Sequence, residues 1–175
     1  MLLRLNKCDV RSWETSDVEP LARHANNRNI WINLRDAFPH PYTKHHARDF
    51  IRATRQRTPE TLFAIAVDGE AIGGVGFVLH PDVERVSAEI GYWLAEPFWG
   101  RGIATEALTA VTRHAIEAHG LTRVYALPFA WNVPSCRVLE KAGFVLEARL
   151  RRSAIKDGVV TDQMQYAFIV PESTL

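Results

Sequence analysis

The sequence has few cysteines, no long apolar run and almost no net charge. Its two cysteines, Cys8 and Cys136, match neither a metal-binding spacing nor a disulfide framework, so we expect no metal and a reduced, cytoplasmic setting. No apolar run approaches the ~18 residues of a membrane span, and the first residues lack the apolar core of a signal peptide. The formal net charge is +1, so we expect neither nucleic acid nor a membrane as a partner.

What the chain does have is the composition of one globular domain. Of its 175 residues, 47% are hydrophobic and 10% aromatic, which is enough to bury a full core. Internal repeats, low-complexity segments and linkers are not apparent in the sequence. We therefore expect a single domain over residues 1–175.

Periodicity predicts a mixed α/β (α+β) fold. Helices are expected to begin near Ser16, Thr43 and Asn132, and another to end at His119, whereas residues 26–42 show no regular pattern. The strands expected from alternation and turn signals cover residues 3–5, 62–67, 71–80, 85–94, 122–128, 144–152 and 159–169. This order predicts a mostly antiparallel sheet of about seven strands with helices packed against it.

The segment that organises the chain lies between the strand at 85–94 and the helix that ends at His119. Gly100 and Gly102 stand at this strand-to-helix junction, where bare backbone N–H groups and a helix N-terminus together form an anion site. A P-loop would need Lys and Ser or Thr after the second glycine, and neither is present. A dinucleotide site would need an acid at the end of the next strand, which instead ends in Leu-Pro-Phe.

The run Trp99-Gly100-Arg101-Gly102-Ile103-Ala104 resembles the pyrophosphate loop Q/R-x-x-G-x-G/A of the GNAT superfamily of N-acetyltransferases, with Trp in place of the first residue. Residues 38–43, 89–94 and 132–144 also resemble the family and come in the right order. The residue pattern is similar to that of the RimJ/RimL branch, which acetylates the N-termini of ribosomal proteins. The resemblance implies the GNAT fold, with helices on both faces of the sheet and a splayed strand pair at the acetyl-CoA site.

In this family acetyl-CoA is held by a strand, the glycine loop and the start of a later helix. The cofactor contacts implied here are Tyr92, Trp93, Leu94, Trp99, Gly100, Arg101, Gly102, Ile103, Ala104, Thr105, Asn132 and Ser135. The residues expected to contact the acceptor are Trp31, Phe38, Tyr42 and His80. For the aromatic segment 31–42 the alternative is a structured loop that plugs the edge of the core.

Acetyl transfer needs a group that takes a proton from the amine and a group that protonates the leaving thiolate. Glu89 is the candidate base, because it lies on the strand that leads to the glycine loop; the alternative is a carboxylate paired with a structural arginine. Ser135 is the candidate acid, since Leu139 stands where many relatives have Tyr; the alternatives are a water or no acid. Asn132 is also expected to cap its helix.

Three functions remain open at this point. The first is transfer of an acetyl group to a protein N-terminal amine by direct attack, without an acyl-enzyme. The second keeps the enzyme but takes a small amine, such as a polyamine, an amino acid or an antibiotic. The third is a non-catalytic acyl-CoA-binding module. Because homodimers are the commonest soluble oligomers and this branch often forms them, a homodimer is also expected.

Overall fold

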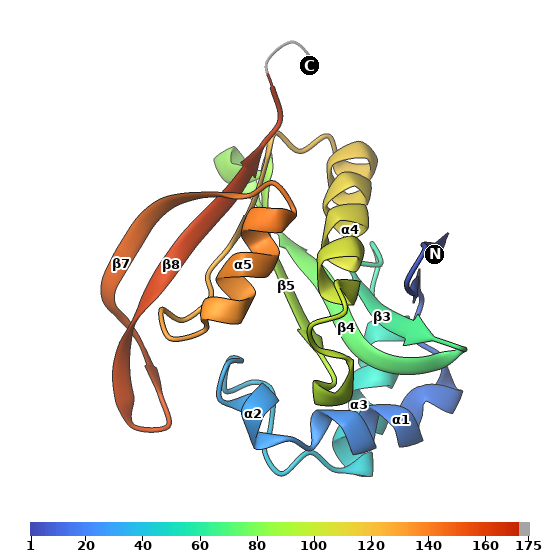
Figure 1. Ribbon diagram of the computed structural model, residues 1–175. Helices are drawn as coiled ribbons and strands as arrows, with labels where there is room; N and C mark the ends of the chain where they lie inside the picture. Colours follow the sequence, from blue (N-terminus) through green and yellow to red (C-terminus); the bar gives the residue numbers. More distant parts are fainter. Residues whose placement is uncertain (172–175) are drawn as a thin grey trace. The chain divides into compact units, whose positions relative to one another are not determined.

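The computed structural model describes residues 1–171 and has an eight-stranded sheet with helices packed on it (Figure 1). The strands are β1 (Leu2–Arg4), β2 (Asp9–Arg11), β3 (Leu62–Val67), β4 (Glu70–Leu79), β5 (Ser87–Leu94), β6 (Arg123–Ala126), β7 (Val145–Lys156) and β8 (Val159–Ile169). The helices are α1 (Val18–Ala25), α2 (Arg28–Trp31), α3 (Lys44–Arg55), α4 (Ile103–His119) and α5 (Val133–Lys141). Short 3-10 turns are η1 (Thr15–Asp17), η2 (Asp82–Glu84) and η3 (Glu96–Phe98).

The strand order is β1-β2-β3-β4-β5-β6-β8-β7. The β5–β6 pair is parallel, whereas the pairs β1–β2, β2–β3, β3–β4, β6–β8 and β7–β8 are antiparallel. The expected mixed, mostly antiparallel sheet is confirmed. It has one strand more than the sequence predicted, because β2 is three residues long and too short to show an alternating pattern.

Two compact units make up the chain, and each is described by itself. The first comprises residues 1–76 and 92–107, and the second comprises residues 77–91 and the chain from Leu108 onward. None of the helices within residues 1–171 is long and apolar enough to cross a bilayer.

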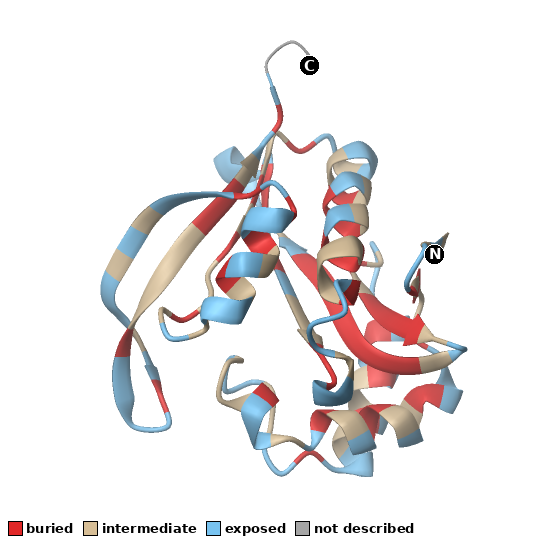
Figure 2. Cartoon of the chain, viewed as in Figure 1, coloured by how far each residue is buried: buried red, intermediate tan, exposed pale blue. Residues whose placement is uncertain are grey.

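In the first unit, α1 and α3 pack on the sheet through one apolar cluster. Leu21 and Ala25 of α1 and Ile51 of α3 are almost completely buried there, together with Ala64 of β3 and Ala71 of β4. These helices follow the periodicity seen in the sequence, and Thr43 caps α3 by accepting a hydrogen bond from the His46 N–H. Figure 2 shows β4 as an almost unbroken buried run, so the central strands form the floor of this core.

In the second unit, the rest of α4 and α5 supply the helical layer. Leu108, Val111 and Ala115 of α4 are fully buried and share one face of the helix. Phe77 of β4 packs against the ring of His119 at 5.5 Å between centroids. Gly120 follows α4 with φ +61°, the left-handed conformation that ends helices.

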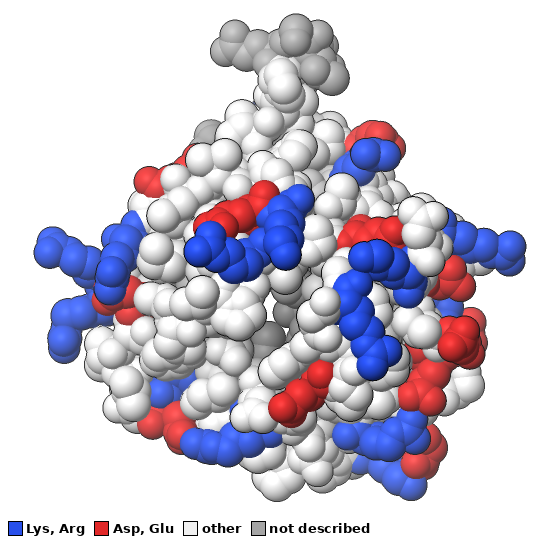
Figure 3. Space-filling view, in the orientation of Figure 1, with Lys and Arg blue, Asp and Glu red and all other residues white. Residues whose placement is uncertain are grey.

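Positively charged side chains lie beside negatively charged ones on the surface seen in Figure 3. Ion pairs within one unit include Arg23–Glu70 and Arg137–Glu140, both at 2.7 Å. The interspersed signs agree with the net charge of +1. Exposed pairs of this kind each contribute little to stability.

Candidate functional site

The glycine loop forms an exposed turn directly before α4. Gly100 and Gly102 have φ of +75° and +77°, a conformation that only glycine adopts without strain. A Cβ atom added at Gly100 would meet nothing within 4 Å, so the backbone here faces open space. The first intrahelical bond runs from Glu106 N–H to Gly102 O at 3.2 Å, and the helix geometry leaves the N–H groups before it without an intrahelical partner.

This arrangement fits a phosphate group. Bare peptide N–H groups at a left-handed turn and the positive end of a 17-residue helix both attract an anion. Residues 99–102 are exposed, so a ligand can reach them. The segment predicted to bind the pyrophosphate therefore has the required backbone shape.

Trp99 explains how the loop tolerates its departure from the family pattern. Its indole N–H donates to the carbonyl of Leu94 at 2.7 Å, which fastens the loop to the end of β5. The Arg101 guanidinium donates to Pro97 O at 2.8 Å and lies over the Phe98 ring at 5.2 Å. Both long side chains thus stabilise the loop conformation.

Two of the residues predicted to bind the acceptor, Phe38 and Tyr42, form an aromatic cluster with Trp93. Phe38 lies 4.9 Å from Tyr42 and 5.7 Å from Trp93 between ring centroids. Burial raises the pKa of Tyr42 to about 12, so its hydroxyl stays protonated. Trp31 stacks on His40 at 5.5 Å. This packing supports the core-plugging interpretation for Tyr42, while Trp31 and Phe38 keep partly exposed faces.

The segment 26–42 is more regular than the sequence indicated, since it contains α2. Asn27 caps α2 by accepting a hydrogen bond from the Asn29 N–H. The Glu96 carboxylate of η3 accepts hydrogen bonds from the side chains of Asn27 at 2.7 Å and Asn29 at 3.1 Å. Sequence reasoning missed this link because Glu96 and Asn27 are 69 residues apart.

In the second unit, Glu89 lies on β5 and pairs with Tyr125 of β6. The parallel register of β5 and β6 runs from Ser87↔Arg123 to Glu89↔Tyr125 in the described residues, whereas β5 continues to Leu94. Glu89 is partly buried and lies on the same sheet face as Tyr125, because paired residues of neighbouring strands point the same way.

Tyr125 brings His80 to this face. The His80 Nε2 and Tyr125 Oη atoms are 2.8 Å apart, and the two rings are stacked with an interplanar angle of 6°. The structure thus places two predicted site residues, His80 and Glu89, beside the same tyrosine. Tyr125 gave no signal in the sequence, since an aromatic residue in a strand is ordinary.

Next to Tyr125, the Arg123 guanidinium forms a bidentate ion pair with the Glu147 carboxylate. This hydrogen bonding lowers the pKa of Glu147 to about 2. A lowered folded-state pKa means that the pair stabilises the fold above the pKa of an unfolded Glu, about 4.3. We expect that stabilisation to disappear as the pH falls from about 4 towards 2.

Urea midpoints of the wild type and Glu147→Gln, measured from pH 7 to pH 2.5, test this prediction. The gap between the two proteins should be largest at pH 7 and should close on acidification. It will be modest, because both side chains are partly exposed and water screens the pair. A gap that is constant with pH would contradict the prediction.

Asn132 and Ser135 meet at the start of α5. The Asn132 side chain accepts a hydrogen bond from the Ser135 N–H at 3.3 Å, so the expected cap is confirmed. Leu139, which stands where the family resemblance implies Tyr, is fully buried. Burial raises the pKa of the Cys136 thiol, which favours a packed residue over a reactive one.

Replacing Asn132 with alanine is expected to destabilise the protein by about 0.5–2 kcal/mol, the usual cost of losing an N-cap. Asn132→Asp should retain most of that stability, because a carboxylate accepts the same hydrogen bond, but it removes the amide donor. Denaturant unfolding and acetyl-CoA titration of both variants separate the two roles. If Asn132→Asp keeps both stability and affinity, the side chain acts only as a cap.

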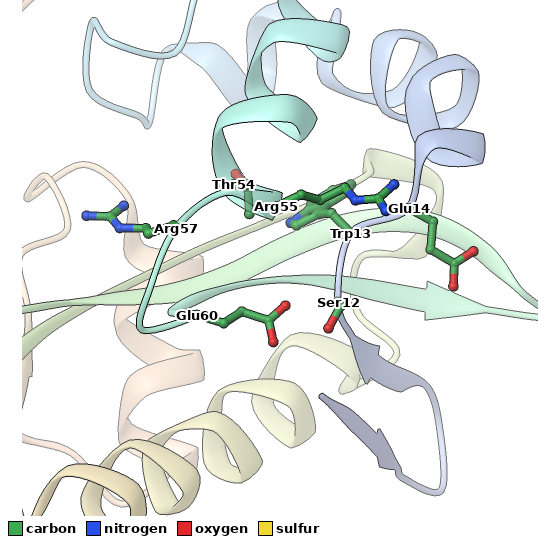
Figure 4. A pocket seen from close by; sticks show the side chains of 7 residues that line it. All are labelled: Ser12, Trp13, Glu14, Thr54, Arg55, Arg57 and Glu60. Atoms are coloured by element: carbon green, nitrogen blue, oxygen red, sulfur yellow. The ribbon is translucent and has the colours of Figure 1, made fainter.

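A separate cavity of about 410 Å³ lies in the first unit (Figure 4). Its lining includes Trp13, Arg55 and Glu60, and it contains none of the residues predicted from the sequence to bind cofactor or acceptor. In Figure 4 the Arg57 side chain points away from Ser12 and Glu60.

Comparison with known proteins supports one family. Residues 9–145 match the model of the acetyltransferase (GNAT) domain. The chain is 35% identical over 102 residues to the uncharacterised N-acetyltransferase YoaA of Bacillus subtilis, covering 58% of this chain and 57% of that protein. It is 32% identical over 115 residues to the ribosomal-protein-serine acetyltransferase of Escherichia coli, covering 66% and 64%. The matches thus span about six tenths of these relatives.

Solved structures extend the likeness to nearly the whole chain. RimJ of Mycobacterium smegmatis, in complex with a CoA disulfide, has a TM-score of 0.82 at 26% identity and covers 93% of this chain and 82% of that one. RimL, a ribosomal alpha-N-protein acetyltransferase, in complex with coenzyme A, has a TM-score of 0.86 at 22% identity and covers 97% and 98%. With its fold, its glycine loop and a domain match over residues 9–145, this chain belongs to the GNAT acetyltransferase family.

Proposed function

We propose that this protein is an acetyl-CoA-dependent N-acetyltransferase that acts on a primary amine, with a protein N-terminal α-amine as the acceptor. One observation carries the proposal: the exposed turn at Gly100 and Gly102 opens the N-terminus of α4 to an anion in a chain of this family. The likeness to ribosomal-protein acetyltransferases supports the choice of acceptor. A single catalytic domain, a cytoplasmic location and a homodimer belong to the same proposal.

When bound, acetyl-CoA would supply an activated acetyl group as a thioester. The backbone of residues 99–105 would hold its pyrophosphate, and the stretch of β5 from Tyr92 to Leu94 would offer peptide groups to its arm. Asn132 and Ser135 would contact the same arm from the start of α5. No metal takes part in this proposal.

The amine must lose a proton as its nitrogen bonds to the acetyl carbon, and the sulfur must gain one as the carbon–sulfur bond breaks. Glu89 is the proposed base, acting directly or through water. Tyr125 and His80 lie beside Glu89 and would provide polar groups near the proton that Glu89 takes from the amine. Ser135 is the proposed donor to the sulfur, since Leu139 cannot fill that role. Trp31, Phe38 and His80 would contact the acceptor.

Calorimetric titration of acetyl-CoA, with NADH as the control, tests the proposal first. We expect micromolar binding of acetyl-CoA and none of NADH. Thiol release should then be measured with N-terminal peptides and with small amines. Turnover with small amines alone would change the acceptor, whereas binding without any turnover would indicate an acyl-CoA-binding module. Absence of binding would overturn the proposed function.

Gel filtration with light scattering tests the oligomeric part of the proposal. A mass of about twice the 19.8 kDa of the chain is expected. A mass of one chain over the whole micromolar range would remove the homodimer from the proposal and leave the activity unaffected.

A further inference from the structure

The turn between β1 and β2 reaches the glycine loop. This tight turn is closed by a hydrogen bond from the Leu5 N–H to Cys8 O at 3.0 Å. At its tip, Lys7 extends its side chain so that Nζ donates to the carbonyl oxygen of Arg101 at 3.0 Å. Lys7 and Arg101 are 94 residues apart in the sequence, so the contact is a product of the fold.

The same turn is fastened at a second point. Glu106, in the first turn of α4, accepts hydrogen bonds from the backbone N–H groups of Asn6 at 3.1 Å and Lys7 at 2.8 Å. Lys7 is therefore held through its backbone at α4 while its side chain holds the loop before α4. Two attachments fix the distance and orientation of the ammonium relative to residues 101–106.

Gly102 is the residue that makes this contact possible. A Cβ atom added there would lie 2.6 Å from Lys7 Nζ, so the ammonium occupies the space that any other side chain would need. The φ of +77° at Gly102 independently favours glycine. The loop thus needs glycine both for its conformation and for the approach of Lys7.

The direction of the Arg101 carbonyl decides where the next N–H group points. In a planar trans peptide the C=O and the following N–H point in opposite directions. Because Lys7 holds the Arg101 carbonyl, the Gly102 N–H is turned away from the β1–β2 turn. The exposed face on that other side is where the proposed function places the pyrophosphate.

We infer that Lys7 is a positioning residue for phosphate binding. It holds the Arg101 carbonyl oxygen and thereby orients the Gly102 N–H towards the exposed side of the loop. This inference rests on the proposed binding of acetyl-CoA. Lys7 does not need to touch the ligand, since its effect passes through the peptide that it orients. Its positive charge also lies within a Debye length of the loop and adds to the attraction of an anion.

The experiment compares wild type with Lys7→Met in calorimetric titrations of acetyl-CoA and in steady-state kinetics. We expect the Kd and KM of acetyl-CoA to rise about tenfold, the order of one charged hydrogen bond at an exposed site. The kcat and the KM of the acceptor should stay unchanged. Glu106→Ala removes the hydrogen bonds that hold the β1–β2 turn at α4, so it should also raise the Kd and KM of acetyl-CoA.

Acetyl-pantetheine provides the decisive comparison, because it carries the thioester but lacks the pyrophosphate. Lys7→Met should leave the kinetic constants of acetyl-pantetheine unchanged. Lys44→Met is the matched control, since it removes an exposed ammonium from the same unit at a site paired with Glu19; it should leave both ligands unaffected.

Three outcomes would overturn the inference. Equal acetyl-CoA affinities of wild type and Lys7→Met would refute it and leave the proposed function standing. An equal loss for acetyl-CoA and acetyl-pantetheine would indicate a general structural role instead. If the wild type itself binds no acetyl-CoA, the proposed function fails and the inference fails with it.

Discussion

Replacing Glu89 with glutamine is expected to lower kcat by about 10²–10⁴-fold, the usual contribution of a general base. Glutamine has nearly the same shape but cannot take a proton from the attacking amine. The acetyl-CoA affinity should stay within about twofold, because the glycine loop lies elsewhere in the chain. The rate of thiol release at saturating acetyl-CoA measures kcat, and calorimetry measures the affinity for acetyl-CoA.

Glu84→Gln is the matched control for this variant. Glu84 is an exposed carboxylate of η2, just before β5, so its removal changes the net charge equally and should leave kcat unchanged. An equal rate for wild type and Glu89→Gln would show that Glu89 is not the general base, and it would leave the proposed acetyltransferase activity standing. An inactive wild type that still binds acetyl-CoA would instead support the acyl-CoA-binding module.

The largest loss of stability is expected from Gly73→Ala. A Cβ atom at Gly73 would lie 2.5 Å from the carbonyl oxygen of Trp93 and 3.1 Å from the Cα atom of Leu94. These obstacles are backbone atoms of β5, which cannot move aside as a flexible side chain does. We expect a cost towards the upper end of the about 1–3 kcal/mol that overpacking brings, hence a melting temperature lower by about 4–10 °C.

Gly91→Ala provides a control with the opposite sign. Gly91 lies on β5, and a Cβ atom there would meet nothing within 4 Å. Alanine at such a site restricts the unfolded chain and raises stability by about 0.4–1 kcal/mol. Thermal unfolding of both variants in one buffer is the measurement. A Gly73→Ala protein as stable as the wild type would show that β4 and β5 can separate without cost.

Local signals in the sequence were sufficient for much of the fold. Asp68-Gly69 predicted a hairpin turn, and both residues have the positive φ, +51° and +83°, that such a turn requires. Asp157-Gly158 likewise closes the β7–β8 hairpin with +49° and +77°. Each of these features depends on a few neighbouring residues, which is why the pattern predicts it.

Features that depend on distant contacts could not be predicted. The strand β2 and the helix α2 are too short for a periodic pattern, and both gain their stability from partners elsewhere in the chain. Lys7 reads in sequence as an ordinary exposed lysine, and only the fold brings it to Arg101. The candidate site shows the same division. The glycine loop was predicted from its backbone requirements, whereas Glu96 and Tyr125 were found from their contacts in the structure.

The hydrogen bonds of the Glu96 carboxylate have a consequence for binding equilibria. It is bonded to Asn27 and Asn29 at one end of the aromatic segment and lies four positions before Gly100. Under the proposed function, a ligand that restrains either loop would restrain the other, and the two binding free energies would be linked. Such linkage is reciprocal: the factor by which acetyl-CoA alters the affinity for an acceptor equals the factor by which the acceptor alters the affinity for acetyl-CoA.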